Sequence, residues 1–253
     1  MTGAVGRLIG VSLGPGDPGC LTLRAWQVLQ GAAAWAYPVT APEGESYALS
    51  IARRAGLSAP ADATPLVFPM TRDPETLAAA WARAAAAVGE LLRQGRDVAF
   101  LVEGDASTYA TFSHLARAVA AEVPESEVET VPGVPSFVAA PARIGWPLAS
   151  QGETLAVLPA GYSIDTVARF LDEVDSLVLL KVRPQLDGVL ELLEARGLLG
   201  HAAFVERAGT PQERIVTDLA SLRGETVHYL SLLLVRCGPG PGQARSPGEG
   251  EGA

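Results

Sequence analysis

The sequence predicts an α/β protein with mostly parallel strands, and two observations support this fold class. Short apolar runs alternate with longer stretches of helical periodicity along the 253 residues, which is the pattern of strands joined by crossover helices. Clusters of Gly and Pro lie between the two kinds of segment, where turns are needed. The length allows one large domain or two smaller ones, since domains usually hold roughly 100–200 residues.

The segments expected as strands in the first half are short and apolar: 8–13, 33–37, 65–68, 98–102 and 128–131. The helices expected between them are 21–30, 46–55, 74–93 and 108–121. The range 74–93 has the most regular helical pattern, because a proline and a glutamate stand in its first turn and apolar residues recur along one stripe.

The regular alternation stops at Pro132, Gly133, Val134 and Pro135, which can continue neither a helix nor a central strand. We therefore expect an N-terminal α/β domain over residues 1–132 and a C-terminal α/β domain over residues 133–237. The expected strands of the second domain are 154–158, 176–181, 202–206 and 229–235, and its expected helices are 164–171 and 185–196. Residues 238–253 hold almost nothing apolar to bury, so we expect a disordered tail there.

The overall charge indicates a small-molecule partner. The chain has 19 Lys plus Arg against 28 Asp plus Glu, a formal charge of −9, and Lys181 is its single lysine. Binding of nucleic acid is not expected, because a phosphate backbone requires clustered cations. No apolar run approaches the roughly 18 residues of a membrane helix, and Cys20 and Cys237 form neither a disulfide framework nor a spaced metal site. We expect a cytoplasmic protein without membrane contact and without a metal.

The first candidate ligand loop is Gly14-Pro15-Gly16-Asp17-Pro18, directly after the strand at 8–13. Glycine-rich loops between a strand and a helix let a ligand approach the backbone closely. The spacing of a dinucleotide fingerprint is absent, the prolines remove two N–H donors, and no Gly-Lys-Ser/Thr is present. The loop is therefore either a ligand loop of another kind or a tight turn that only reverses the chain.

A second candidate loop runs from residue 103 to 109 and carries Gly104 between the carboxylates of Glu103 and Asp105. Open α/β sheets place their ligands at the carboxyl ends of parallel strands, so a carboxylate in this position can accept a ribose hydroxyl. The alternative is that Asp105 or Ser107 simply caps the following helix. Residues 132–136 form a third strand-end loop of the same kind.

Taken together, these motifs resemble the tetrapyrrole methylase family, the methyltransferases of cobalamin and sirohaem synthesis. The resemblance rests on the Gly-Pro-Gly-Asp-Pro loop, on Glu-Gly-Asp at 103–105 with Tyr109, and on Pro-Gly-Val at 132–134, and it runs in register from about residue 7 to 236. The stretches 36–39, 68–73, 95–99, 147–149 and 155–160 are most similar to the members that methylate carbon 20 of precorrin-2.

The resemblance implies two α/β domains of the non-Rossmann, class III methyltransferase type, with S-adenosylmethionine in the cleft between them and a homodimeric assembly. The substrate it implies is a tetrapyrrole, precorrin-2 or cobalt-factor II. The positions that match the family's cofactor contacts are Pro15, Glu103, Gly104, Asp105, Thr108, Ser136, Leu180 and Ala208.

Substrate contacts are implied at Asp17, Tyr37 and Tyr109, which are also the nearest candidates by motif for moving a proton, although no catalytic residue is assigned. The tetrapyrrole carries a rim of carboxylates, which arginine can bind in a bidentate manner. Arg72 is the first choice for that contact and Arg143 the second.

The sequence departs from the family pattern at a few positions. Ser12 stands where a glycine is frequent, Ala106 where a proline commonly follows Gly-Asp, and Pro135 where a serine or threonine is usual. Pro38 replaces an aspartate of the related uroporphyrinogen enzymes, so no role of that aspartate is transferred. The alternatives are methylation of the cobalt-containing analogue, methylation of another ring position, and a non-catalytic protein that binds S-adenosylmethionine or a tetrapyrrole.

Overall fold

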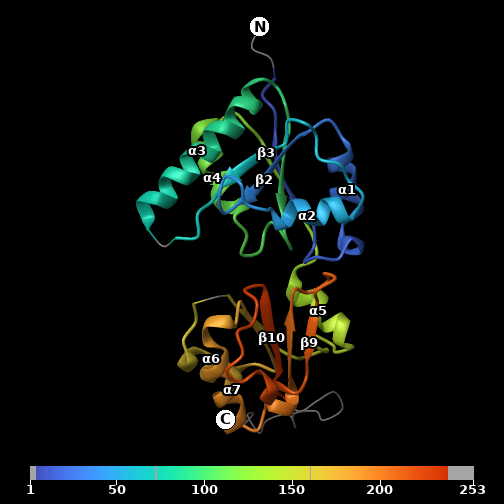
Figure 1. Cartoon of the computed structure of the whole chain (residues 1–253), viewed down its shortest axis with the longest axis vertical. Helices are drawn as coiled ribbons and strands as arrows, with labels where there is room; N and C mark the ends of the chain where they lie inside the picture. The colour runs from blue at the N-terminus through green and yellow to red at the C-terminus, as the bar shows by residue number, and fades with distance from the viewer. Residues whose placement is uncertain (1–3, 72, 160, 239–253) are drawn as a thin grey trace, which may run out of the picture. The chain divides into compact units, whose positions relative to one another are not determined.

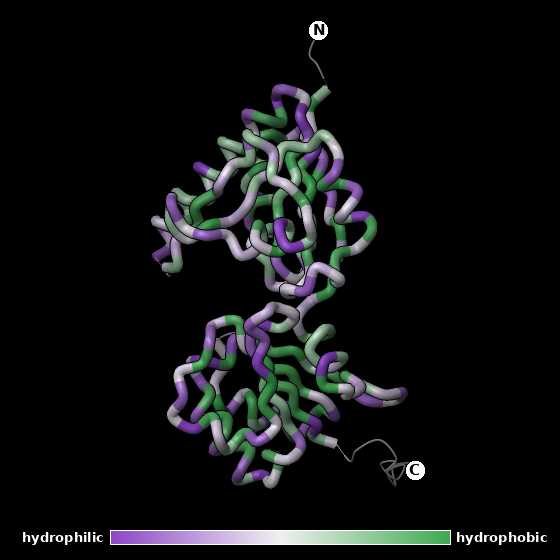
Figure 2. The backbone as a smooth tube through the Cα atoms, turned by 45° about the vertical axis from the view of Figure 1, so that its right-hand side comes forward, coloured by the Kyte–Doolittle hydropathy of each residue, from purple (hydrophilic) through white to green (hydrophobic). Residues whose placement is uncertain are grey.

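The computed structural model describes residues 4–71, 73–159 and 161–238. The chain divides into two compact units, Met1–Ser136 and Phe137–Ala253, each with its own five-stranded sheet. In both units the apolar stretches of the chain run through the interior strands (Figure 2). Arg72 and the predicted tail beyond Gly238 lie outside the described residues.

Every strand of the first sheet is parallel to its neighbours, in the order β3-β2-β4-β1-β5. β1 and β4 are buried along their whole length, as expected of parallel strands that are covered on both faces. The predicted strands of this half are confirmed, with ends shifted by at most two residues. Their bounds are β1 (Leu8–Ser12), β2 (Ala34–Val39), β3 (Thr64–Val67), β4 (Val98–Val102) and β5 (Val128–Val131).

Helices cover both faces of the first sheet (Figure 1). One core, around Phe100, lies under α3 and α4, and the other, around Trp35, lies under α1 and α2. The helix predicted over 74–93 is confirmed at both ends, and it begins there because the Asp73 carboxylate accepts a hydrogen bond from the Thr76 amide at 2.9 Å. The bounds are η1 (Pro18–Cys20), α1 (Leu23–Gln30), α2 (Tyr47–Arg54), α3 (Pro74–Arg93) and α4 (Phe112–Glu122).

The second sheet has the order β6-β7-β10-β8-β9, and only β6 and β7 are parallel. The expectation of mostly parallel strands is therefore wrong for this unit. The reason lies between β8 and β10, where the chain forms only the short strand β9 and a 3₁₀ turn, and a parallel return would need a full crossover helix. The bounds are β6 (Leu155–Leu158), β7 (Ser176–Leu180), β8 (Ala202–Glu206), β9 (Arg214–Val216) and β10 (Ser231–Arg236).

The helices of the second unit also pack on both faces of their sheet. α6 and α7 cover one face together with η4, and α5 covers the other through Ala140. α5 and β9 are elements that the sequence pattern did not predict. The bounds are α5 (Ser136–Ile144), α6 (Ile164–Glu173), η2 (Arg183–Gln185), α7 (Leu186–Ala195), η3 (Leu199–His201) and η4 (Leu219–Leu222). No helix in the described part of the chain is both long and apolar enough to cross a membrane.

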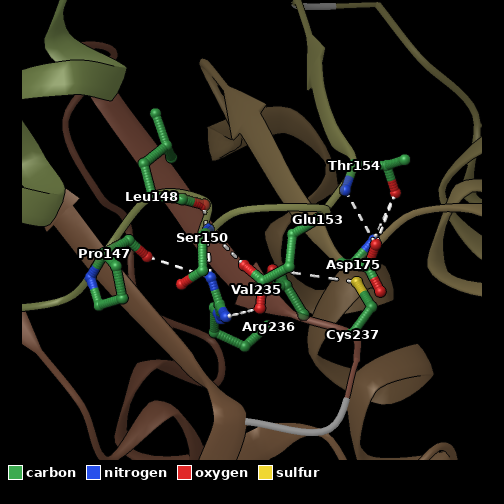
Figure 3. Close-up of polar contacts among 9 residues, drawn as sticks. All are labelled: Pro147, Leu148, Ser150, Glu153, Thr154, Asp175, Val235, Arg236 and Cys237. Atoms are coloured by element: carbon green, nitrogen blue, oxygen red, sulfur yellow. Dashed lines mark hydrogen bonds and ion pairs between the residues drawn. The ribbon is translucent and has the colours of Figure 1, made fainter. Parts of the chain in front are cut away.

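A cluster of polar contacts lies at the carboxyl end of β10 (Figure 3). Arg236 forms an ion pair of 2.7 Å with Glu153, and only 11% and 17% of the two side chains are exposed. The same guanidinium donates a hydrogen bond to the carbonyl of Pro147 at 3.1 Å. The charge of Arg236 is therefore used inside the fold.

Asp175 forms the neighbouring part of this cluster (Figure 3). Its Oδ2 accepts hydrogen bonds from the amide and the hydroxyl of Thr154, at 2.9 and 2.8 Å. Burial, reinforced by the charge of Asp175, raises the pKa of the Cys237 thiol to about 11. That thiol is consequently protonated at neutral pH and has little nucleophilic character.

Replacing Arg236 by methionine is expected to lower the free energy of unfolding by about 2–4 kcal/mol, because Glu153 is left without its cation in a poorly hydrated place. Urea denaturation of the wild type and the variant measures this difference. Arg169→Met is the matched control, since Arg169 is 64% exposed and 3.9 Å from Glu173, and exposed pairs contribute little. Equal effects of the two substitutions would contradict the structural role of Arg236.

Candidate functional site

Three loops meet at the carboxyl edge of the first sheet. They follow β1 (residues 13–17), β4 (residues 103–111) and β5 (residues 132–135), and the three strands are neighbours in the order β4-β1-β5. We call them together the three-loop cluster. Parallel strands bring these segments to one edge although they lie far apart in the sequence.

The first two loops are joined by a short antiparallel bridge between Gly14 and Gly104. The amide of Gly14 donates to the Gly104 carbonyl at 3.1 Å, and the amide of Gly104 donates to the Gly14 carbonyl at 2.7 Å. Both residues have positive φ, 75° and 69°, a conformation that glycine adopts without steric cost. The glycines of both motifs are thus required by the backbone that joins the loops.

Ser12, the last residue of β1, connects the three loops through its hydrogen bonds and its packing. This residue is completely buried, and its hydroxyl donates to the Val131 carbonyl at 2.6 Å while it accepts the Ala106 amide at 2.8 Å. The Cα of Gly133 lies so close that an added Cβ would overlap the Cβ of Ser12. The departure from the family pattern at Ser12 therefore has a structural purpose, and a lone polar residue in an apolar strand was the signal for it.

Asp105 is the buried carboxylate of the cluster, with 7% of its surface exposed. Its Oδ1 accepts hydrogen bonds from the Ser107 amide at 2.9 Å and the Thr108 hydroxyl at 3.1 Å. Its Oδ2 accepts the Gly133 amide at 2.8 Å and so reaches across to the third loop. Burial alone would raise the pKa of Asp105, but the hydrogen bonds from Ser107, Gly133 and Thr108 outweigh it and hold the pKa below its usual range.

The alternative that Asp105 or Ser107 caps the next helix is wrong. α4 begins at Phe112, later than the predicted residue 108, and its N-cap is Thr111, whose side chain makes no capping bond. The residues before it form the loop because Asp105 takes up their donors. Asp105 therefore connects two loops instead of starting a helix.

The first loop is held in place from α2. Pro15 is buried, and its carbonyl accepts a hydrogen bond from the Tyr47 hydroxyl at 2.9 Å. The carbonyl of Gly16 accepts a hydrogen bond from the Arg54 guanidinium, also at 2.9 Å. Asp17 accepts the Gly19 amide at 2.8 Å and caps the 3₁₀ turn η1. The loop is thus a fixed structure whose prolines shape the turn.

The remaining predicted contacts of the first unit are arranged less tightly. Glu103 is exposed, Tyr109 is 55% exposed with a φ of 50°, and Ser136 is the first residue of α5. Tyr37 lies in β2, where it is half-buried against the core around Trp35. The structure brings Gly104, Asp105 and Thr108 together, and Tyr37 and Tyr109 remain predicted substrate contacts.

In the second unit, Leu180 ends β7 and Ala208 follows β8, and both belong to the core that α5 covers. Arg143, the second choice for a substrate carboxylate, is bound to Glu213 at 2.9 Å. Arg72, the first choice, lies outside the described residues. Of the two arginines chosen from the sequence, the one that the structure describes is therefore already engaged in an ion pair.

The charge of the three-loop cluster limits the ligands that suit it. Asp17, Glu103 and Asp105 belong to these loops, which contain no Lys or Arg. These loops offer no cationic side chain to a phosphate, while their carboxylates and backbone amides suit sugar hydroxyls. Among the described residues, no group of three or more His, Cys, Asp or Glu is arranged to hold a metal ion.

The fold and the loops define a class: a two-unit α/β protein with carboxylate-bearing loops at the edge of a parallel sheet and without a dinucleotide or P-loop fingerprint. The family model described as Tetrapyrrole (Corrin/Porphyrin) Methylases matches residues 7–223, and the chain belongs to this family. The predicted family and the predicted α/β class are both confirmed.

Three curated relatives illustrate the similarity. Cobalt-precorrin-2 C(20)-methyltransferase of Salmonella typhimurium is 34% identical, over 91% of this chain and 96% of the relative. Precorrin-2 C(20)-methyltransferase of a Sinorhizobium species is also 34% identical, over 91% and 95%. The cobalamin biosynthesis protein CobIJ of Mycobacterium tuberculosis is 35% identical over 92% of this chain, which spans only 46% of that protein's length.

Solved structures show the same architecture. Uroporphyrin-III C-methyl transferase from Thermus thermophilus, in complex with S-adenosylhomocysteine, has a TM-score of 0.61 at 25% identity, covering 92% of this chain and 98% of that one. A cobalt precorrin-4 methyltransferase has a TM-score of 0.66 at 20% identity, covering 92% and 96%. The latter similarity concerns the fold alone.

Proposed function

We propose that the protein transfers a methyl group from S-adenosylmethionine to carbon 20 of precorrin-2 in the biosynthesis of cobalamin. The observation that carries this proposal is the similarity to two relatives named for methylation of carbon 20, one of precorrin-2 and one of cobalt-precorrin-2, at 34% identity over more than 90% of both chains. A family match alone would leave the ring position open, whereas these relatives share it.

The three-loop cluster supports S-adenosylmethionine as the methyl donor. The ligand carries a sulfonium cation and ribose hydroxyls and no phosphate, which fits loops that contain carboxylates and lack cations. We propose that Pro15, Glu103, Gly104, Asp105, Thr108 and Ser136 contact it. The assignments of Leu180 and Ala208 to the cofactor stay predictions for the second unit.

Bound S-adenosylmethionine would supply an activated methyl group to the electron-rich meso carbon of the tetrapyrrole. The protein therefore contributes mainly by orientation, since the reacting atoms must be held in line and in contact. The hydrogen bonds of Ser12 and Asp105 give the loops one fixed geometry for that purpose. The group that removes the proton after transfer is unassigned.

Methylation of the cobalt-containing analogue is the second candidate, because the relatives named for the two substrates are equally similar to this chain. A homodimer and a cytoplasmic location, both implied by the resemblance or the composition, belong to the same proposal. Asp17, Tyr37, Tyr109 and Arg72 stay proposed substrate contacts.

The test is to incubate the protein with methyl-labelled S-adenosylmethionine and either precorrin-2 or its cobalt analogue, without oxygen. We expect the label at carbon 20 of the metal-free ring, located by carbon NMR of the isolated product. A boiled sample controls for uncatalysed transfer. Label at another carbon would correct the ring position, faster transfer to the cobalt ring would favour the second candidate, and no transfer to either ring would refute the methyltransferase proposal.

A further inference from the structure

The second unit contains an open cavity of about 400 Å³ beside the carboxyl ends of β7 and β8. It is lined by Arg183 from η2, Glu206 and Arg207 from the end of β8, Gln212, and Thr226, Val227 and His228 before β10. All the residues that line it belong to the second unit.

Arg183 and Arg207 are distinguished by their lack of an ionic partner. Neither forms an ion pair with any residue that the structure describes. Every other described arginine of the second unit does so: Arg143, Arg169, Arg196, Arg214, Arg223 and Arg236. In a protein with a net charge of −9, the two unpaired guanidinium groups face the same cavity.

The one carboxylate at the cavity is already engaged. Oε2 of Glu206 accepts the backbone amide of His228 at 2.8 Å. Nδ1 of His228 accepts the Leu230 amide at 3.1 Å, so the neutral ring carries its proton on Nε2, which can donate. Burial and the charges of Arg207 and Arg183 lower the pKa of His228 against the opposing effect of Glu206.

The backbone holds Arg207 in a conformation that side chains rarely adopt, with a φ of 50°. Its amide donates to the Leu230 carbonyl at 2.8 Å, and its carbonyl accepts the Thr210 amide at 3.0 Å and the Thr210 hydroxyl at 2.9 Å. These hydrogen bonds hold the Arg207 backbone in its strained conformation and fix the position from which the side chain extends. Lys181, with a φ of 53°, follows β7 at the same end of the sheet.

We propose that Arg183, Arg207 and His228 form a binding site for an organic carboxylate. The proposal rests on the proposed function, under which two ligands carry such a group. The acidic side chains of the tetrapyrrole are one source. The methionine part of S-adenosylmethionine is the other, since Ala208, a predicted cofactor contact, directly follows Arg207. Two guanidinium groups and an imidazole N–H are suitable donors for a carboxylate.

Equilibrium binding tests the site without turnover. The probes are uroporphyrin III, an air-stable tetrapyrrole with eight carboxylates, and S-adenosylhomocysteine, which keeps the methionine carboxylate. We expect Arg183→Gln and Arg207→Gln each to weaken the binding of one probe at least about tenfold, the loss of one charge-assisted hydrogen bond. Arg169→Gln is the control with the same charge change on the same unit, and it is expected to bind both probes as the wild type does.

Glu206→Gln gives a test in the opposite direction. The amide oxygen of glutamine can still accept the His228 amide, while one negative charge leaves the cavity, so the affinity for the same probe is expected to rise about threefold. Arg183 is exposed at the start of a short turn, and its substitution leaves the strained backbone of Arg207 unchanged. The thermal unfolding midpoint of each variant verifies that the unit remains folded.

The two probes identify the source of the carboxylate. Weaker binding of uroporphyrin III alone assigns the site to the substrate, and weaker binding of S-adenosylhomocysteine alone assigns it to the cofactor. Unchanged affinity of Arg183→Gln for both probes, or wild-type protein that binds neither, overturns the proposal. Methyl transfer by the wild type is measured separately, so a failed reaction together with arginine-dependent binding would refute the function and leave the carboxylate site standing.

Discussion

Replacing Asp105 by alanine is expected to weaken the binding of S-adenosylhomocysteine at least about 100-fold and to lower the free energy of unfolding by about 2–4 kcal/mol. The substitution removes the acceptor for Ser107, Thr108 and Gly133, and the amides of Ser107 and Gly133 are left without a protein partner. The second and third loops then lose the side chain that joins them. Isothermal titration measures the affinity, and urea denaturation measures the stability.

Two further variants make this result specific. In Asp105→Asn one oxygen can still serve Ser107, but the amide nitrogen then opposes the Gly133 N–H, so an intermediate loss is expected. Asp172→Ala removes an exposed carboxylate that is paired with Arg196, and it should leave the affinity unchanged. Wild-type affinity of Asp105→Ala would show that the three-loop cluster does not bind this ligand.

The lowered pKa of Asp105 also predicts a pH dependence. A carboxylate whose pKa is lower in the folded state stabilises the protein above the pKa of the unfolded chain, about 3.9, and this contribution disappears as the pH falls through the folded value. The stability difference between the wild type and Asp105→Asn is therefore expected to be constant near neutral pH and to shrink below about pH 4. A difference that grows on acidification would contradict this sign.

Replacing Gly133 by alanine is the second substitution with a large expected effect. The new Cβ would overlap the Cβ of Ser12 and lie 2.8 Å from the Gly104 carbonyl oxygen. Since Ser12 is completely buried, the third loop must move away and its hydrogen bond to Asp105 lengthens. We expect a loss of about 2–3 kcal/mol in the free energy of unfolding, in the range of overpacked sites, with cofactor binding reduced at least about tenfold.

A double mutant separates the steric cause from other effects. Ser12→Gly alone costs stability because two buried hydrogen bonds are lost, but it also makes room for a side chain at position 133. Gly133→Ala should therefore cost less in the Ser12→Gly background than in the wild type. Gly200→Ala is the control, because a Cβ there meets no atom within 4 Å. Strictly additive effects would rule out the contact with Ser12 as the cause.

The fold could be predicted where local pattern and topology agree. The helix at 74–93 begins with an acid and a proline and keeps one apolar stripe, and the structure has it with the same ends. α5 could not be predicted in this way, because Pro132 and Pro135 precede it and Pro141 lies inside it. Its helical form depends on packing Ala140 against the second sheet, a tertiary contact that no local pattern contains.

The meeting of the three loops could be predicted from the sequence, and the hydrogen bonds between them could not. Parallel strands require their carboxyl ends to share an edge, so the loops at Gly14, Gly104 and Gly133 could be brought together from the sequence alone. The pairing of Asp105 with Gly133 depends on the register of β1 with β4 and β5, which only the structure provides. The sequence likewise could not show that Arg183 and Arg207 lack an ionic partner among the described residues, because ion pairing depends on which side chains the fold brings together.

The order of the strands also determines when each unit can fold during synthesis. All strands of the first sheet have been made once residue 131 is complete, so this unit can fold as soon as it leaves the ribosome. In the second sheet the last strand to be made, β10, is the central one, paired with both β7 and β8. Until residues 231–236 emerge, the apolar edges of β7 and β8 have no partner, so the nascent second unit is the part of this chain most exposed to aggregation.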